Sequence, residues 1–405
     1  MKRRILLSVL FCFLMQACFA GGKNKIENGP ANYIVINGVE ATSEAFQQMA
    51  GLFGKAEGKR TAIGVGFIIS YFQEDPVEAV RELKAYLTLS ELFDIPVVVQ
   101  IDGESWWKNR PDLWNWWDKN KPGYHPENKN NVEWSSWTPD SAVQIGWRNW
   151  GRQMRVLPMP NLMSKTYRQA CYTEMGKLIP IIKDWWNGLP EKKKYLLIGI
   201  KVGWESSIGV NNYYYPNGNV QLNQPELSDP AYGLKTDLLP GRGVQTIGYA
   251  SVRTLGLASS GEMKASYLAE VIRTHLEDLS KHVSDYGIPR NRIFTHCGGW
   301  SKGETLYTAA VNQYSCPGWS FYGYAENPRK DSTAMEALAK SDAPCWGAVE
   351  WLYMGDHTTD EWIRALNNTL TTSRLKYVCV YNWSDVIHNP QCVAAIRYVT
   401  KGKRK

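Results

Sequence analysis

Short apolar runs, rich in β-branched residues, recur along the chain and are separated by longer stretches with a helical pattern. Runs of this kind are typical of strands that are buried on both faces of a sheet. The sequence predicts eight such strands, YIVIN (33–37), IGVGFIISYF (63–72), IPVVVQI (95–101), YLLIGIKVGW (195–204), RIFTHC (292–297), SFYGYA (320–325), CWGAVEWLYM (345–354) and YVCVYNW (377–383).

A helical stretch follows most of these strands. The stretch DPVEAVRELKAYLTLSELF, after the second strand, opens with an acidic turn and Pro76, as helices commonly do. Between the fifth and sixth strands only LYTAAVNQY offers a short helix. Eight strands that alternate with helices favour an α/β fold, the closed (β/α)8 TIM barrel.

A doubly wound open sheet is the alternative fold. Sheets of that type commonly bind a nucleotide through a glycine-rich loop after the first strand. No such loop follows YIVIN, and PGRGVQ (240–245) is an isolated glycine-rich segment. No Pro/Gly-rich linker divides the chain, so we expect residues 21–405 to form a single barrel domain.

The N-terminus has the pattern of a signal peptide, predicted at residues 1–20. MKRR supplies a positive segment, ILLSVLFCFLMQ an apolar segment, and Cys18-Phe19-Ala20 a small-residue cleavage site. MQAC also loosely resembles a bacterial lipobox, in which Cys18 would carry a lipid anchor. We therefore expect an exported protein, which is periplasmic, extracellular or anchored to the outer membrane of a bacterium.

Charge and cysteine content exclude two classes of binding protein. The formal net charge is +7, but the N-terminal segment supplies three positive charges and the tail from Lys401 four more. The body of the chain is therefore near neutral and lacks the basic surface that binds nucleic acid. The six cysteines beyond the leader contain no CxxC pair, which argues against a zinc knuckle. We expect mostly buried free thiols, with a disulfide or two as the alternative.

Two glutamates occupy equivalent places in the repeated unit. Glu205 directly follows the fourth strand, and Glu350 lies near the end of the seventh. The active sites of barrel enzymes lie at the carboxyl ends of the strands. Two carboxylates across the mouth of the barrel can approach to about 5–5.5 Å, the separation found in retaining glycosidases.

With this layout, residues 33–400 resemble clan GH-A, the retaining (β/α)8 glycoside hydrolases. The resemblance implies that Glu205 is the acid/base on strand four and that Glu350 is the nucleophile on strand seven. The clan has an asparagine before the acid/base, where it binds the sugar 2-hydroxyl, and here that position is Trp204. Another residue then binds the 2-position, or the substrate differs there, or another carboxylate, Glu326 or Asp102, belongs to the catalytic pair.

The same resemblance assigns two aromatic residues. Trp383, at the end of the eighth strand, is similar to the aromatic floor beneath the sugar at the cleavage point. Tyr324, in FYGYAEN, is similar to the strand-six tyrosine that donates to the nucleophile. Glu326, two residues on, is the main rival catalytic carboxylate. A tryptophan that caps the barrel core is an equally ordinary interpretation of Trp383.

Polar residues end several other strands. His296, at the end of the fifth strand, could orient the acid or a sugar hydroxyl, although a single histidine is more often a satisfied core residue. Three further side chains are candidates for binding sugar hydroxyls, namely Asp102, Glu104 and Asn37. The six histidines form neither HxH nor HExxH, so we expect no metal and no cofactor.

Two long insertions, after strands three and four, are rich in aromatic residues. The first reads GESWWKNRPDLWNWWDKNKPGYH and continues EWSSWTPDSAVQIGWRNWGRQ, and the second contains NNYYYPNGNVQLNQPEL. Aromatic rings stack on sugar faces, although such rings can also form a small core within a loop. We expect two or three of nine tryptophans to line the site: Trp106, Trp107, Trp114, Trp116, Trp117, Trp134, Trp137, Trp147 and Trp150.

Together these features predict an exported retaining glycoside hydrolase that cleaves a β-linked neutral oligo- or polysaccharide by double displacement. Two alternatives stay open. One is a barrel protein that binds glycans without catalysis, and the other is a glycosidase that uses a different carboxylate pair. The sugar, and endo or exo action, are not specified by these patterns.

Overall fold

The computed structural model describes residues 29–144, 146–149, 153–206, 208, 228–229, 234–235, 247–297 and 308–401. The predicted signal peptide with Cys18, and nearly all of the second insertion, lie outside these residues. In the described part of the chain no helix combines the length and the apolar character needed to cross a membrane.

Eight parallel strands form a closed barrel in the order β1-β12-β11-β10-β9-β6-β3-β2. This confirms the predicted (β/α)8 TIM barrel and excludes the open sheet. The strands are β1 (Asn32–Asn37), β2 (Thr61–Ser70), β3 (Val97–Asp102), β6 (Leu197–Ser206), β9 (Ile293–Cys297), β10 (Gly318–Phe321), β11 (Trp346–Trp351) and β12 (Leu375–Val380).

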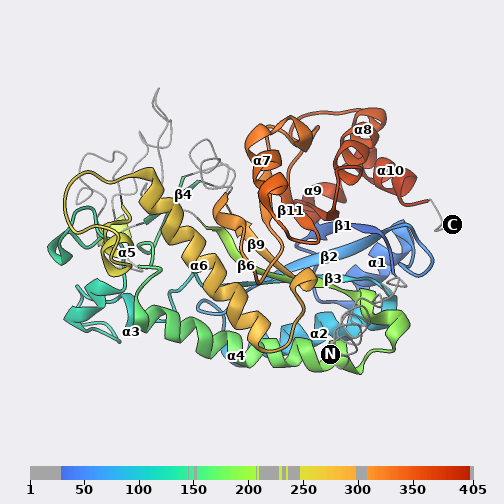
Figure 1. Ribbon diagram of the computed structural model, residues 1–405. Coiled ribbons are helices and arrows are strands. Elements are labelled where there is room, and N and C mark those ends of the chain that lie inside the picture. The colour runs from blue at the N-terminus through green and yellow to red at the C-terminus, as the bar shows by residue number, and fades with distance from the viewer. Residues whose placement is uncertain are drawn as a thin grey trace, which may run out of the picture.

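Helices surround the strands, with α4 and α8 on opposite sides of the barrel in Figure 1. The α-helices are α1 (Ser43–Phe53), α2 (Pro76–Phe93), α3 (Pro111–Trp114), α4 (Lys165–Gly188), α5 (Tyr249–Thr254), α6 (Ala265–Asp285), α7 (Ser332–Lys340), α8 (Thr359–Leu370), α9 (Trp383–Val386) and α10 (Pro390–Val399). Short 3-10 helices are η1 (Pro126–Asn130), η2 (Pro139–Ser141), η3 (Glu191–Leu196), η7 (Arg290–Arg292) and η9 (Pro328–Lys330). Two small antiparallel ribbons pair β4 (Gly146–Asn149) with β5 (Gln153–Val156), and β7 (Ser228–Asp229) with β8 (Leu234–Lys235).

Local signals explain where the helices begin. Asp75 caps α2 by accepting hydrogen bonds from the backbone N–H groups of Val77 and Glu78, with Pro76 in the first turn. Thr358 and Glu361 form a reciprocal capping box at the start of α8. Such caps satisfy backbone donors that have no partner within the helix, and they define the residue at which each helix begins.

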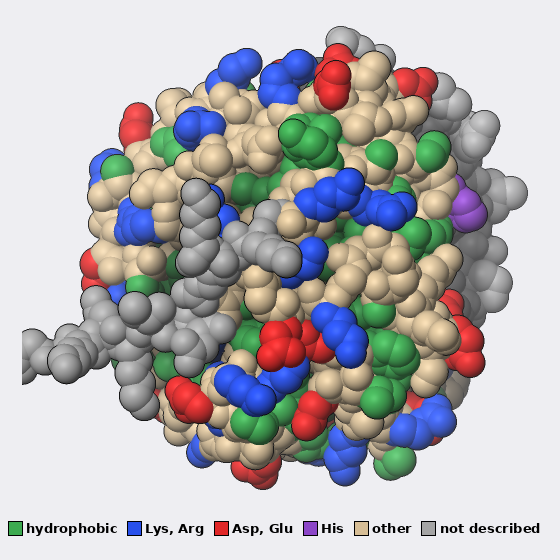
Figure 2. Space-filling view, turned by 90° about the vertical axis from the view of Figure 1, so that its right-hand side faces the viewer, with side chains coloured by type: hydrophobic (Ala, Val, Ile, Leu, Met, Phe, Trp, Pro, Cys, Tyr) green, Lys and Arg blue, Asp and Glu red, His purple; other side chains and the backbone are tan. Residues whose placement is uncertain are grey.

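The apolar core has two layers. One cluster fills the barrel and includes Tyr33, Val98, Ile198, Phe294 and Tyr377, and the other lies between the strands and the surrounding helices. All six cysteines are buried, and the sulfurs of Cys316 and Cys345 lie 3.1 Å apart. On the face shown in Figure 2, basic and acidic side chains are intermixed.

The first insertion is tied to the rest of the molecule by Glu133, which is fully buried. This carboxylate accepts hydrogen bonds from the backbone N–H groups of Gly248 and Ala250 and from the hydroxyl of Ser251. Burial raises the pKa of Glu133 to about 7, although these hydrogen bonds favour its charged form. The insertion is thus held against α5 by a structural carboxylate.

Candidate active site

Irregular strand pairing determines the positions of Glu205 and Glu350, which together form the glutamate pair. Between Val202 and Ser206, β6 advances four positions while its neighbour β9 advances two. The pairing of β11 with β10 also shifts by one residue just before Glu350. A β-bulge bends its strand and changes the direction of the next side chain. Glu205 therefore lies within a bulge, and Glu350 directly follows one, at the carboxyl ends of their strands.

The two carboxyl groups are buried close together. Glu205 is 5% exposed and Glu350 is 6% exposed. One carboxylate oxygen of each residue lies within 4.8 Å of the other, and both lie within that distance of a ring nitrogen of His296. This spacing is nearer to the about 5–5.5 Å that separates the carboxyl groups of retaining glycosidases than to the about 6.5–9.5 Å of inverting enzymes.

The hydroxyl of Tyr322 bridges the two glutamates. It lies 2.6 Å from Oε1 of Glu205 and 2.7 Å from Oε1 of Glu350. A phenol has one proton to donate. Both contacts are therefore hydrogen bonds only when one of the two carboxyl groups is itself protonated. The geometry describes a glutamate pair that holds a single proton.

Electrostatics support a shared proton. Burial, and then the charge of Glu205, raise the pKa of Glu350 to about 8, while Lys201 and the hydrogen bond from Tyr322 act in the opposite direction. Lys201 is buried on β6, and its Nζ donates to the carbonyl oxygen of Val349 at 3.2 Å, next to Glu350. Two carboxylates this close cannot readily both ionise, and the raised pKa of Glu350 agrees with that.

His296 joins the pair through a hydroxyl. Its Nε2 lies 2.9 Å from Oγ of Ser320, and Ser320 donates to Oε1 of Glu205 at 3.3 Å. The single proton of Ser320 is used in that bond, so Nε2–H of the imidazole donates to Oγ. Burial, assisted by the charge of Lys201, keeps the pKa of His296 well below its usual range. The ring is therefore neutral, and it orients Ser320. Nε2 of His296 also lies 3.6 Å from Oε2 of Glu350.

The tyrosine expected to donate to the nucleophile is Tyr322 rather than Tyr324. Strand β10 ends at Phe321, so Tyr322 is the first residue beyond the strand and points to the barrel mouth. Tyr324 lies two residues further along the turn and is 44% exposed. Glu326, the rival catalytic carboxylate, has a side chain that is also 44% exposed and lies 3.5 Å from Arg364. The structure therefore does not bring Glu326 to the glutamate pair.

Three of the predicted sugar-binding residues have structural contacts. Asp102 and Glu104 are both almost fully buried, and Oδ1 of Asp102 accepts from the backbone N–H of Glu104 at 3.0 Å. Glu104 is turned toward Ser206 and the helix α6. Asn37 lies at the end of β1, and its Nδ2 donates to Oδ1 of Asn382 at 3.4 Å.

The aromatic residues at the end of β12 divide between two places. Tyr381, which the sequence did not single out, interacts electrostatically with both glutamates. Burial, and then the charges of Glu350 and Glu205, raise the pKa of Tyr381. Trp383 begins α9 instead of ending the strand, and it is half-buried. Trp204 is also half-buried, beside Glu205 on β6.

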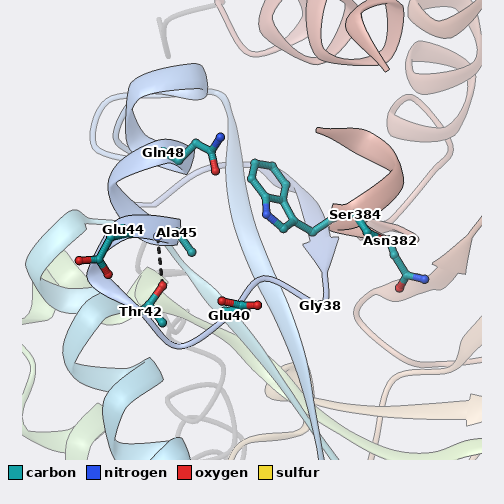
Figure 3. A pocket seen from close by; sticks show the side chains of 9 residues that line it. Gly38, Glu40, Thr42, Glu44, Ala45, Gln48, Asn382 and Ser384 are labelled. Atoms are coloured by element: carbon teal, nitrogen blue, oxygen red, sulfur yellow. Dashed lines mark hydrogen bonds between the residues drawn. The ribbon is translucent and has the colours of Figure 1, made fainter. Parts of the chain in front are cut away.

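Trp383 lines a cavity of about 620 Å³ at the carboxyl ends of β1 and β12. Figure 3 shows Gln48 and Ala45 of α1 on one side of the cavity, Asn382 and Ser384 on the other, and Glu40 between them. Neither Glu205 nor Glu350 lines this cavity. The cavity lies at the end of β12, which is the neighbour of β11, the strand that carries Glu350.

The described tryptophans of the first insertion mainly pack in or against the main hydrophobic core. Trp107, Trp114 and Trp134 are buried, and each indole N–H donates to a backbone carbonyl within the insertion. Trp116, Trp117 and Trp137 are partly buried against the main core. The side chains of Trp147 and Trp150 lie outside the described part of the chain. None of the described tryptophans of this insertion contributes to the two cavities at Trp383 and at Asn161.

One set of described side chains could hold a metal ion, namely Glu205, His296 and Glu350. All three are buried and converge on one point, and a neutral imidazole with two carboxylates is a donor set that divalent metals accept. Tyr322 contacts Oε1 of both glutamates and Ser320 contacts Oε1 of Glu205, however, and these hydrogen bonds suit a proton-sharing pair.

No family model matches this chain, and no curated protein matches it in sequence. Solved structures with similar folds include a glycoside hydrolase family 5 enzyme from Prevotella bryantii B14, with 9% identity and a TM-score of 0.41 over 93% of this chain and 97% of that one. A ruminal GH26 endo-β-1,4-mannanase shares 9% identity and a TM-score of 0.45 over 93% of this chain and 64% of that one. A GH5-4 broad-specificity endoglucanase from an uncultured bacterium shares 8% identity and a TM-score of 0.43 over 93% and 94%. At these identities the likeness is one of fold alone.

Proposed function

We propose that this protein is a retaining glycoside hydrolase that acts on a β-linked neutral glycan. The observation that carries the proposal is the glutamate pair, two buried carboxyl groups within 4.8 Å that are bridged by one tyrosine hydroxyl at the carboxyl ends of facing barrel strands. The predicted leader at residues 1–20 would export the enzyme to such a substrate, and a mature chain that begins after Ala20 is the check on this part.

The reaction is a double displacement. Glu350 attacks the anomeric carbon while Glu205 gives its proton to the departing glycosidic oxygen, which leaves as an alcohol and creates a glycosyl ester on Glu350. Glu205, now a carboxylate, then takes a proton from a water molecule as that water attacks the same carbon. The ester bond breaks, the sugar leaves with its original anomeric configuration, and both residues return to their starting states.

The surroundings of the pair act on these separate roles in both directions. Burial and the charge of Glu205 raise the pKa of Glu350, whereas Lys201 and the hydrogen bond from Tyr322 favour its ionised form. The mechanism needs the single shared proton to lie on Glu205 when the glycan is bound. A protonated Glu205 can donate to Tyr322, which then donates to the Glu350 carboxylate. Two carboxyl groups with different environments can in this way serve as acid and nucleophile.

A barrel protein that only binds glycans is the competing function. Such a protein would gain nothing from two desolvated carboxyl groups, because burial of a carboxylate costs free energy that a sugar hydroxyl does not return in full. The buried pair therefore favours catalysis over binding alone.

The anomer released first should have the configuration of the bond that is cleaved. Hydrolysis of a β-glycoside followed by proton NMR should show the β-anomer of the product before mutarotation produces the α-anomer, because two inversions at one carbon restore its configuration. Appearance of the α-anomer first would show direct attack by water, and Glu350 would then not be the nucleophile.

We also propose that the cavity beside Trp383 binds a sugar residue of the substrate. A half-buried indole offers an apolar face for the C–H face of a pyranose, and Glu40, Gln48 and Asn382 around it offer acceptors and donors for hydroxyl groups. The cavity lies at the end of the strand next to the one that carries Glu350, so a chain that crosses the barrel mouth could occupy both.

Replacing Trp383 with alanine should lower kcat/KM for oligosaccharides by about ten-fold, since loss of ring stacking and apolar contact is worth on the order of 1–2 kcal/mol. The loss should appear mainly in KM and should shrink for short aryl glycosides that do not reach the cavity. Tyr398→Ala, on the exposed surface of α10, is the matched control and should change neither. An equal loss on long and short substrates would place Trp383 outside the binding path.

A further inference from the structure

The backbone around Glu205 adopts a conformation that its sequence would not choose freely. Glu205 has φ of 47°, in the left-handed region that residues with a side chain rarely occupy, and Gly203 has φ of 80°. A Cβ on Gly203 would lie 2.5 Å from Oγ of Ser206 and 2.7 Å from Leu276. The chain therefore folds tightly over Gly203, and something must hold Glu205 in its unfavourable backbone conformation.

A buried hydrogen-bonded cluster lies directly behind this turn. Oγ of Ser206 donates to Oε1 of Glu104 at 2.7 Å, and Nε2 of His275 lies 2.9 Å from the same oxygen. These three side chains are between 0% and 3% exposed. Glu104 comes from the loop after β3, Ser206 from the end of β6, and His275 from α6. The cluster thus ties the bulged strand end to two neighbouring elements.

Further contacts fix both sides of the cluster. The backbone N–H of Glu104 donates to Oδ1 of Asp102 at 3.0 Å, which sets the position of Glu104 just after the end of β3. Ser206 pairs with Cys297 of β9 after the bulge. The peptide between Glu205 and Ser206 is therefore held from both sides, and this peptide determines where the Glu205 carboxyl group points.

We propose that Glu104, Ser206 and His275 are positioning residues for Glu205, and that they hold the bulge in the conformation that turns its carboxyl group toward Tyr322. None of the three belongs to the glutamate pair, and Glu104 acts on the reaction through Ser206 instead of binding a sugar hydroxyl. This inference rests on the proposed role of Glu205 as acid/base.

Ser206→Ala and Glu104→Gln test the inference. Ser206→Ala removes the hydroxyl with little change in volume, and Glu104→Gln keeps the shape of the side chain but removes its charge. A displaced acid/base protonates the leaving group poorly, and a shift of about 1 Å can cost on the order of 100-fold. We expect kcat/KM for glycosides with a sugar leaving group to fall about ten-fold or more beyond any fall for activated aryl glycosides.

The ratio of the two substrates separates positioning from stability. A purely structural defect reduces the amount of folded enzyme and lowers both activities alike, so it leaves the ratio unchanged. Ser90→Ala is the matched control, because Ser90 is equally buried and its Oγ donates to the carbonyl oxygen of Ile95, away from the β6 bulge. It should lower the thermal unfolding temperature without changing the ratio.

Failure of the inference can be told apart from failure of the proposed function. Suppose that the wild-type enzyme is active and that added azide restores aryl glycoside turnover in Glu205→Ala. If both cluster variants then keep the wild-type ratio of the two substrate activities, the cluster does not position Glu205. If one variant does not fold, the ratio measured on the other decides. If azide does not restore Glu205→Ala, the acid/base role itself is wrong, and the inference falls with it.

Discussion

Replacing Glu350 with alanine should abolish turnover of every glycoside, whatever its leaving group. The variant has no group that can form the glycosyl ester, and loss of a nucleophile typically costs on the order of 10⁵-fold or more in kcat. Activated aryl glycosides, which need little help from an acid, should fall as far as natural oligosaccharides. Release of the aryl group over time, measured for both substrate classes at saturating concentration, gives the comparison.

Glu326→Ala is the matched control for this experiment. Glu326 is a glutamate near the same end of the barrel, but its side chain is 44% exposed and lies beside Arg364. Its loss should leave kcat within about two-fold of the wild type, because an exposed ion pair contributes little. The opposite pattern, with Glu326→Ala inactive and Glu350→Ala active, would contradict the assignment of the pair.

The strand pattern was sufficient to predict the barrel and the place of both glutamates. Glu205 and Glu350 follow long apolar runs, and a closed barrel directs the carboxyl ends of all its strands to one mouth. Period-two alternation could not predict the two bulges, since these arise from the pairing of β6 with β9 and of β11 with β10. Without the bulges, neither the direction of the carboxyl groups nor the positive φ of Glu205 can be inferred.

The sequence points to Tyr324 as the tyrosine beside the glutamates, where the structure has Tyr322, and this difference also arises at the end of a strand. The sequence pattern predicts one strand over SFYGYA, whereas β10 ends at Phe321 and Gly323 begins a turn. A glycine two residues after Phe321 was a usable signal that the strand stops early. Had the strand been ended there, Tyr322 would have been the first residue at the mouth of the barrel.

Buried polar residues were harder to interpret from the sequence. Lys201 lies within an apolar run, and Ser320 begins another, so neither carries a pattern of its own. Their roles depend on neighbours that are distant in sequence, with Lys201 contacting the backbone of Val349 and Ser320 lying between His296 and Glu205. Similarly, composition alone could not separate tryptophans that pack in the core from tryptophans of a sugar site.

Replacing Glu205 with alanine should produce a different defect from the loss of Glu350. The variant keeps its nucleophile, so activated aryl glycosides with acidic phenols should still form the glycosyl ester, which then accumulates because no base activates water. Glycosides with a sugar leaving group need a proton donor and should lose on the order of 10³-fold or more in kcat/KM. A burst of phenol followed by slow turnover is the expected time course.

Azide and pH together complete the test of Glu205. Azide attacks without a general base, so it should restore aryl glycoside turnover in Glu205→Ala and give a glycosyl azide of retained configuration. Removal of the neighbouring carboxylate also removes one of the causes that raise the pKa of Glu350. The nucleophile should then ionise at lower pH, and formation of the glycosyl ester in the variant should extend further into the acidic range than in the wild type. Equal losses on aryl and natural substrates, without azide rescue and without this shift, would show that Glu205 is not the acid/base.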